Sequence, residues 1–468
     1  MQREKPTGFS LCCFGLFFLL LLIPAISYGQ RIKKEIYHNA LNGNFTRSAT
    51  LATDIESSET NPAIATPTLI SATIEAFLEA TPEKIDYAAK LAGNILEMNE
   101  ASSYDEIFAY SAKSLLNALE EDYVPALYTS LKAYSSLKQH LNHQNCIEPE
   151  IIALATIFNS AYKKIPSGYW FLLNMAGIDS LSYKKTQACP DIKYPELVST
   201  LEIVQQTLND KDTLQTNRNT PAMGHLIAAA YYLKKQIPKM AGQHLKKIDS
   251  TGNYPATQFY YWGVMRLNLG HYETSEWYFN KYLFLQQKGR YIKSALLRKK
   301  WIAVLKEQPF SNLDRAIENR GTAYTFADRQ ALKEYRDQYH PGLLEARICF
   351  DGGRFRDALQ VLNSIDTKNL TQYRLNEYHY RKARAHQLQK QNKKALDEYR
   401  QLLELPNDGH YYHKKAMLER GKIFLDMGIT SNANKSLKQV MQVKSNMYSK
   451  VIEHEAEMLL EKIENSKK

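Results

Sequence analysis

The stretch YYWGVMRLNLGHYETSEWYFNKYL, residues 260–283, combines many Tyr and Trp residues with two small residues and a glycine between them. Gly263 and Ser275 lie twelve positions apart, and Gly270 stands between them. This spacing predicts two helices that cross at the small residues and are joined by a turn at Gly270. The aromatic residues then form either a binding surface or the packing between helices.

The same arrangement recurs along the C-terminal half of the chain, in segments that begin near residues 226, 343, 380 and 418. The first small residue is Ala229, Gly263, Ala346, Ala383 or Gly421, and the second is Ala241, Ser275, Ala358, Ala395 or Ala433. Gly270, Gly353 and Gly428 fill the turn position in three of the five segments, and a large residue follows at Phe279, Leu362, Tyr399 and Leu437. Small residues let antiparallel helices approach closely, and we expect the large residue to face the next pair.

This order of residues resembles the tetratricopeptide-repeat (TPR) family, in a divergent form that we assign to exported bacterial proteins. Gly263, Gly270, Tyr272, Ser275 and Phe279 carry the resemblance, which covers about residues 222–465. It implies an all-α fold in which antiparallel helix pairs stack into a right-handed solenoid. The first small residues are spaced 34, 83, 37 and 38 positions apart, so one more repeat fits the long interval. The segment WIAVLKEQPFSNLDRAI matches it weakly, with Val304 and Ala316 in the two small positions.

The 468 residues divide into four predicted parts. Residues 1–29 form a signal peptide, 30–60 a degenerate helix pair around Gly43 and Phe45, 61–215 an acidic-to-mixed helical domain of repeat-like type, and 216–468 the TPR-like repeat domain. Pro62 and Pro67 predict a loop, and later helices are expected to start near Pro82, Ser103 and Pro125. The chain has only 20 Gly and 16 Pro, which favours helix over sheet.

The N-terminus has the layout of a secretory signal peptide. Arg3 and Lys5 precede an apolar run, and small residues at Ser27 and Gly29 predict cleavage after Gly29. An uncleaved membrane anchor is the alternative, because the run is almost long enough to span a bilayer. Both interpretations place the rest of the chain outside the cytoplasm, and we expect a periplasmic protein of a Gram-negative envelope. In that oxidising compartment Cys146 and Cys189 could form a disulfide.

Charge is distributed unevenly along the chain. Residues 60–150 contain five Lys and thirteen Asp or Glu, whereas residues 151–468 carry a net charge of +18. The basic part favours acidic partners or an anionic envelope surface, although it could also be no more than a solvated surface. Nucleic acid is not expected as a partner, because an exported protein rarely meets it and no nucleic-acid-binding motif occurs.

Enzyme motifs are absent from the sequence. It contains no GxxxxGK[ST], GxGxxG, GxSxG or HExxH pattern. His140, His143 and Cys146 are spaced like metal ligands on one helix face, but no fourth ligand accompanies them. We therefore expect no metal site, no cofactor and no enzymatic activity.

Binding is a better supported function than catalysis. In the TPR fold the first helices of successive pairs line a concave groove. The position after the first small residue is Arg347, Arg384 or Lys422 in the last three repeats, which predicts three cations along that groove. Arg beside Tyr suits carboxylates and peptide backbone, through bidentate hydrogen bonds and ring stacking. Alternatively, this column reflects only the frequency of Lys and Arg at exposed helix positions.

The candidate groove residues are Tyr260, Arg347, Tyr380, Arg384, Lys415 and Lys422. We predict a non-enzymatic protein-interaction module of the cell envelope, whose basic groove binds an acidic or extended peptide segment of a partner protein. The alternative is a structural or assembly component of an envelope complex, acting through charge polarity and self-association. Association with the envelope membrane and the oligomeric state stay open. Most aromatic residues of the opening stretch are expected in the core, and Tyr260 and Trp277 are the exceptions to check.

Overall fold

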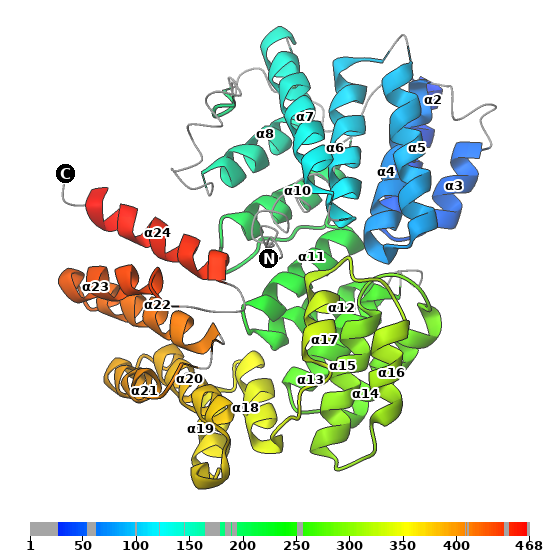
Figure 1. The fold of residues 1–468 in the computed structure, drawn as a ribbon. Helices are drawn as coiled ribbons and strands as arrows, with labels where there is room; N and C mark the ends of the chain where they lie inside the picture. The colour runs from blue at the N-terminus through cyan, green and yellow to red at the C-terminus, as the bar shows by residue number, and fades with distance from the viewer. Residues whose placement is uncertain are drawn as a thin grey trace.

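The computed structural model of the chain is helical throughout the part that it describes (Figure 1). It describes residues 27–465 apart from 54–61, 99–100, 121, 145, 164–177, 183–188, 190–193, 250–255, 408, 410 and 444–448. These ranges contain no β-strand, which confirms the predicted all-α class. The predicted signal peptide lies outside them except for residues 27–29, so cleavage after Gly29 stays a prediction.

The N-terminal half is built from eight helices within the described ranges. They are α2 (Ser27–Leu41), α3 (Phe45–Thr53), α4 (Pro62–Glu79), α5 (Pro82–Glu97), α6 (Ser103–Leu119), α7 (Tyr123–His143), α8 (Pro149–Tyr162) and α10 (Pro195–Leu208). A turn with a positive φ at Gly43 joins α2 to α3. Starts at Pro82, Ser103 and Tyr123 agree with the expected positions.

The C-terminal half is a series of paired helices. The pairs are α11 (Ala222–Lys234) with α12 (Pro238–Asp249), α13 (Thr257–Asn268) with α14 (Tyr272–Leu285), α15 (Ile292–Leu305) with α16 (Ser311–Asn319), α18 (Pro341–Asp351) with α19 (Phe355–Asn363), α20 (Gln372–Leu388) with α21 (Asn392–Glu404), and α22 (Tyr411–Asp426) with α23 (Thr430–Val440). A single helix α17 (Phe326–Glu334) precedes α18, a short 3₁₀ turn (Thr367–Asn369) precedes α20, and α24 (Ser449–Asn465) follows the last pair.

The small residues lie where the paired helices cross, as predicted. A Cβ on Gly263 would lie only 2.6 Å from the ring of Phe279, and a Cβ on Gly421 only 2.6 Å from the side chain of Leu437. The Ser275 hydroxyl donates a 2.8 Å hydrogen bond to the carbonyl of Gly263, which ties α14 to α13 at the crossing. The large residues are fully buried between helices.

The turn between paired helices has the same conformation in all five aligned segments. Gly270, Gly353 and Gly428 have φ of +82°, +69° and +73°, and Gln236 and Lys390 occupy the same position with φ of +62° and +60°. The turn is therefore left-handed even where the sequence offers no glycine.

Two predictions about local structure are wrong. Pro67, predicted in a loop, lies within α4, where it costs one backbone hydrogen bond near the helix start. Burial of Leu69 and Ile74 on the same helix offsets that loss. The extra repeat exists as α15 with α16, but Val304 and Ala316 do not mark its crossing, because the left-handed turn residue is Glu307 rather than a residue seven positions after Val304.

The C-terminal end of α4 is one place where the two halves of the chain meet. Hydrogen bonds from Thr257, Gln286 and Arg290 end on the backbone carbonyls of Phe77, Leu78 and Glu79. The last carbonyls of a helix have no partner within it, so these bonds cap α4. Gly289 lies so close that a Cβ there would be 1.9 Å from the Glu79 oxygen. We call this contact the α4 clasp.

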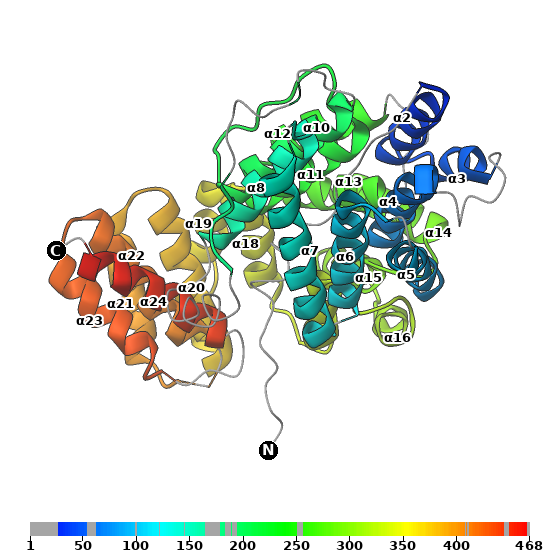
Figure 2. The same cartoon turned by 90° about the horizontal axis from the view of Figure 1, so that it is seen from above.

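One continuous hydrophobic core runs from Tyr37 in α2 to Met265 in α13, across the predicted domain boundary at residue 215. Beyond it, α18 packs against both α13 and α15, and the pairs from α18 to α23 extend as an arm ending in α24 (Figure 2). Cys146 and Cys189 form a disulfide, with their Cα atoms 5.1 Å apart. Over the described ranges, no helix combines the length and the apolar character that crossing a membrane requires.

Candidate functional site

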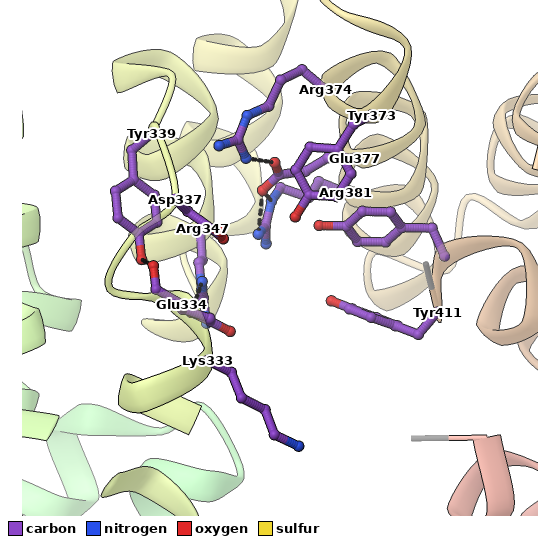
Figure 3. Close-up of a pocket in the computed structure, with 11 residues that line it drawn as sticks. Lys333, Glu334, Asp337, Tyr339, Arg347, Tyr373, Arg374, Glu377, Arg381 and Tyr411 are labelled. Carbon is purple, nitrogen blue, oxygen red and sulfur yellow. Dashed lines mark hydrogen bonds and ion pairs between the residues drawn. The ribbon is translucent and has the colours of Figure 1, made fainter. Parts of the chain in front are cut away.

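A pocket of about 230 Å³ opens between α17, α18, α20 and α22 (Figure 3). Three of these elements are the first helices of successive pairs, and we call the surface that α18, α20 and α22 form the first-helix face. The pocket is lined by Lys333, Glu334, Asp337, Tyr339, Arg347, Tyr373, Arg374, Glu377, Arg381, Tyr411 and Tyr412. Four cations and three carboxylates thus surround one opening.

Arginine–carboxylate pairs fix the walls of the pocket. Arg347 on α18 donates a 2.9 Å hydrogen bond to Glu334, at the end of α17. On α20, Glu377 accepts hydrogen bonds from both Arg374 and Arg381, the latter through two nitrogens at 2.8 and 2.6 Å. Both Arg381 nitrogens bond to Oε1 of Glu377, and such charge-assisted hydrogen bonds hold the guanidinium groups in place.

The carboxylates of the pocket differ in the direction of their pKa shifts. Burial disfavours ionisation of Glu334 and Glu377, but the neighbouring arginines outweigh it, so both pKa values are lowered. Asp337 has no such pair among the described side chains; burial, and then the charge of Glu334, raise its pKa. Glu334 and Glu377 are therefore poor proton donors, and Asp337 is the carboxyl most easily neutralised.

Tyrosines make the remaining wall. The ring of Tyr412 lies 5.9 Å from Tyr373, 5.3 Å from Tyr380 and 4.5 Å from Tyr411, measured between centroids. Figure 3 shows the Tyr411 side chain entering from α22, opposite the guanidinium groups of α18 and α20, while Lys333 points toward open space. The result is a rigid aromatic surface facing a cationic one.

The arrangement suits an anionic group better than a cation. Arg347 and Arg381 lie close enough to repel each other, and Lys333 is exposed at the rim. An incoming carboxylate would reduce that repulsion and could accept hydrogen bonds from the guanidinium groups.

The structure divides the predicted groove residues into three groups. Arg347 lines the pocket, and Tyr380 is a half-buried residue behind its tyrosine wall. Arg384, Lys415 and Lys422 instead share the buried carboxylate of Glu419, at 2.5, 3.3 and 3.1 Å. Glu455 of α24 pairs with both lysines as well. These three cations form an internal ladder of ion pairs that joins α20, α22 and α24.

Tyr260 is not a groove residue, which corrects the prediction from the sequence. Its side chain is only 3% exposed, its ring stacks on that of Tyr291 at 4.2 Å, and its hydroxyl hydrogen-bonds to Ser294 at 2.9 Å. It occupies the core because α15 packs over this side of α13. Trp277, the other aromatic exception, is 54% exposed on α14.

The histidine and cysteine cluster near residue 140 has other partners. His140 is buried, with its ring nitrogens 3.0 Å from the Ser103 hydroxyl and 3.1 Å from a Glu148 oxygen. Cys146 is consumed by the disulfide with Cys189. Within the described ranges no group of His, Cys, Asp and Glu is placed to hold a metal ion.

Sequence reasoning missed most of the pocket. Arg374, Glu377 and Arg381 follow one another at three- and four-residue spacing, the pattern of ion pairs on one helix face. This pattern could have identified the α20 wall. The contribution of Tyr411 and Tyr412 depends on how α22 sits beside α20, and local spacing does not reveal it.

Comparison with known proteins assigns no family to the chain. No family model and no curated protein matches the sequence. Among solved structures it is similar to a monomeric mutant of IFIT1 with Gppp-AAAA, to yeast Tom70 and to the APC/C hetero-tetramer Cut9–Hcn1. Identities are 12%, 12% and 11%, TM-scores are 0.29, 0.24 and 0.23, and the alignments cover 97%, 94% and 96% of this chain and 99%, 96% and 99% of the others. From its own geometry the chain is an all-α, TPR-like stack of antiparallel helix pairs.

Proposed function

We propose that the protein is a non-enzymatic protein-interaction module whose first-helix face binds an extended, acidic segment of a partner protein. The observation that carries this proposal is the pocket between α17, α18, α20 and α22, where Arg347 and Arg381 face tyrosine rings and Lys333 stands at the rim. Guanidinium groups donate hydrogen bonds to carboxylates, and aromatic rings pack against peptide backbone and side chains.

The size of the pocket favours a macromolecular partner. Sites for whole small molecules usually enclose about 300–1,000 Å³, whereas this pocket has about 230 Å³. It would hold one side chain of a longer segment, with the neighbouring residues lying along α18, α20 and α22. A single exposed contact contributes only about 0.5–1 kcal/mol, so several along the face would act together.

The chemistry of the pocket supports binding rather than catalysis. Glu334 and Glu377 are held ionised by arginine partners, whereas a general acid needs a pKa near the working pH. Asp337 remains, but one carboxyl does not by itself make a catalytic set.

We further propose that binding takes place outside the cytoplasm, in the cell envelope of a bacterium. The charged start, apolar run and small residues of positions 1–29 support export. The Cys146–Cys189 disulfide supports an oxidising compartment.

Binding of a short fluorescein-labelled peptide of alternating Glu and Ser, measured by fluorescence anisotropy, tests the acidic-segment proposal. Lys333→Glu should weaken binding about fivefold, because it reverses an exposed charge at the rim. Asp337→Asn should strengthen it, because it removes a negative charge that repels the ligand.

The control is Lys435→Glu, which makes the same charge change on the exposed side of α23, away from the first-helix face. It should leave the affinity unchanged. Equal binding of the matching Gln–Ser peptide, or equal effects of Lys333→Glu and Lys435→Glu, would show that the pocket does not select acidic segments.

A further inference from the structure

Helix α14 carries an exposed aromatic face, which is separate from the first-helix face. Trp277, Phe284 and Leu285 are 54%, 78% and 52% exposed. Trp277, Lys281 and Phe284 follow at intervals of four and three residues, so they lie on one side of the helix. Large apolar side chains that gather on a surface mark an interaction site more often than isolated ones do.

The face is held in a fixed arrangement. The Lys281 ammonium lies 4.1 Å from the ring centroid of Phe259 and 5.1 Å from that of Trp277. Trp277 packs edge-on against Tyr278 at 4.9 Å, and Tyr278 in turn stacks on the buried Trp262 at 5.5 Å. The exposed Trp277 ring is thus anchored to the core of the repeat, which lowers the entropy lost when it binds.

The C-terminal end of this face carries lysines. Lys281 and Lys288 flank Phe284 and Leu285 there, whereas Glu273 and Glu276 at the start of α14 pair with Lys306. The Lys288 side chain, just after Leu285, is 74% exposed, and its nearest carboxylate is Glu83 at 3.4 Å. Arg320 also reaches this end of the helix, 3.5 Å from the Leu283 carbonyl. An anionic partner therefore complements this end of the face electrostatically.

The shape of this α14 face favours a partner with a deformable surface. Phe284 and Leu285 project from the end of a helix rather than lining a groove. In both views α14 lies apart from α20 and α22 (Figures 1 and 2). A lipid bilayer adapts to projecting side chains, and its headgroup region is where Trp is enriched and where lysines meet anionic lipids.

We infer that the exposed face of α14 docks on the surface of an anionic lipid bilayer, with Trp277, Phe284 and Leu285 entering the headgroup region and Lys281 and Lys288 contacting lipid phosphates. Apolar burial and electrostatic attraction act together in such peripheral binding. The inference is independent of the peptide pocket, because it rests on different residues on another helix.

Sedimentation with vesicles tests this inference on the full chain. Phosphatidylcholine vesicles with one-third phosphatidylglycerol should retain the protein, and vesicles of phosphatidylcholine alone should retain much less. Lys281→Gln and Lys288→Gln should each lower the affinity about fivefold, and Trp277→Ser with Phe284→Ser should abolish retention. The matched control is Val124→Ser with Tyr128→Ser, which removes exposed apolar side chains from α7 instead and should change nothing.

A second measurement keeps the test independent of variant stability. Brominated lipids should quench tryptophan fluorescence in the wild type, and Trp277→Phe should lose that quenching while still sedimenting with vesicles. Absence of binding to anionic vesicles, equal loss in the α7 control, or quenching that survives in Trp277→Phe would each overturn the inference. Loss of peptide binding by Lys333→Glu would leave vesicle binding intact, which separates the two proposals.

Discussion

Gly263 shows how closely the paired helices cross. An added Cβ would lie 2.6 Å from the fully buried ring of Phe279. We expect Gly263→Ala to lower the free energy of unfolding by about 1–3 kcal/mol, because the ring must move out of a packed core. Urea denaturation followed by circular dichroism measures the change. In a Phe279→Leu background the loss should shrink, since the smaller side chain leaves room.

The matched control for that substitution is Gly93→Ala on α5. A Cβ there would meet only the end of the Lys113 side chain, at 3.9 Å. Alanine is the better helix former, so this variant should gain about 0.5–1 kcal/mol. Similar losses at both glycines would contradict the importance of the crossing.

A buried histidine pair makes stability depend on pH. The Nδ1 atoms of His225 and His244 are 3.1 Å apart. Burial lowers both pKa values to about 4; the mutual repulsion of the pair adds to this for His225, and the charge of Lys247 adds to it for both. The unfolded chain, with a pKa of about 6.5 for each ring, then binds more protons below neutrality. Stability conferred by the neutral pair should be complete above pH 6.5 and fall as pH drops from about 6.5 to 4.

Thermal unfolding at several pH values across this window checks the prediction. A His225→Gln and His244→Gln double variant should show a flatter decline of Tm with falling pH than the wild type. His143→Gln, which changes an exposed histidine, should keep the wild-type slope. An unchanged slope in the double variant would assign the dependence to other groups.

At the scale of elements, the helix pairs were predictable because each carries its own local pattern. Small residues twelve positions apart identified the crossings, and the glycines at 270, 353 and 428 identified three turns. Gln236 and Lys390 adopt the same left-handed φ at a cost of about 1–2 kcal/mol each. No sequence signal marks those two turns, because packing of the flanking helices imposes the conformation.

The ion-pair ladder of Arg384, Lys415 and Lys422 could not be predicted from the sequence. The repeat spacing indicates that Arg384 on α20 and Lys422 on α22 occupy equivalent positions on the first-helix face. It does not show that Glu419 lies between them. Which carboxylate meets which cation depends on the stacking of α20, α22 and α24. The sequence therefore revealed the cations but not that the fold neutralises most of them.

Glu419 should be the most sensitive member of that ladder. It is only 2% exposed, and although burial opposes its ionisation, Arg384, Lys422 and Lys415 lower its pKa to about 2. Glu419→Gln should lower the free energy of unfolding by about 3 kcal/mol, because several cations lose their shared partner. The wild-type contribution should be complete above pH about 4.5 and disappear as pH falls toward 2, so acid should narrow the difference between the two proteins.

Glu404→Gln is the control for the ladder prediction. Glu404 pairs with Arg400 one helical turn away, and both side chains are exposed. Its loss should cost less than about 0.5 kcal/mol in the same urea titration. Comparable losses at Glu404 and Glu419 would mean that the buried ladder contributes no more than a surface pair.

At the scale of the whole molecule, the α4 clasp is one of the contacts that hold the two halves together. A Cβ on Gly289 would lie 1.9 Å from the Glu79 oxygen, and the residue also has a φ of +95°. Gly289→Ala should therefore displace the α14–α15 loop from α4. Hydrogen exchange followed by mass spectrometry should show faster exchange near Arg290, whose backbone N–H bonds to Glu79, and Tm should fall.

Gly428→Ala separates the effect of strain from the effect of contact. Gly428 also has a positive φ, of +73°, but nothing lies within 4 Å of its added Cβ. This variant should show only the cost of backbone strain and leave exchange near Arg290 unchanged. Faster hydrogen exchange near Arg290 in both Gly289→Ala and Gly428→Ala would show that loss of the clasp contact is not its cause. No sequence pattern could have predicted this contact, since its partners are 179 to 213 positions apart.

The clasp also bears on how mechanical load would pass through the molecule. Its hydrogen bonds end on main-chain oxygens of α4, and it begins only a few residues after Phe284 and Leu285. A pull applied at the end of α14 would thus reach α4 along the backbone of one short loop. The two helices would then shift together, and α18, which packs against α13 and α15, would pass part of the load to the arm from α18 to α24.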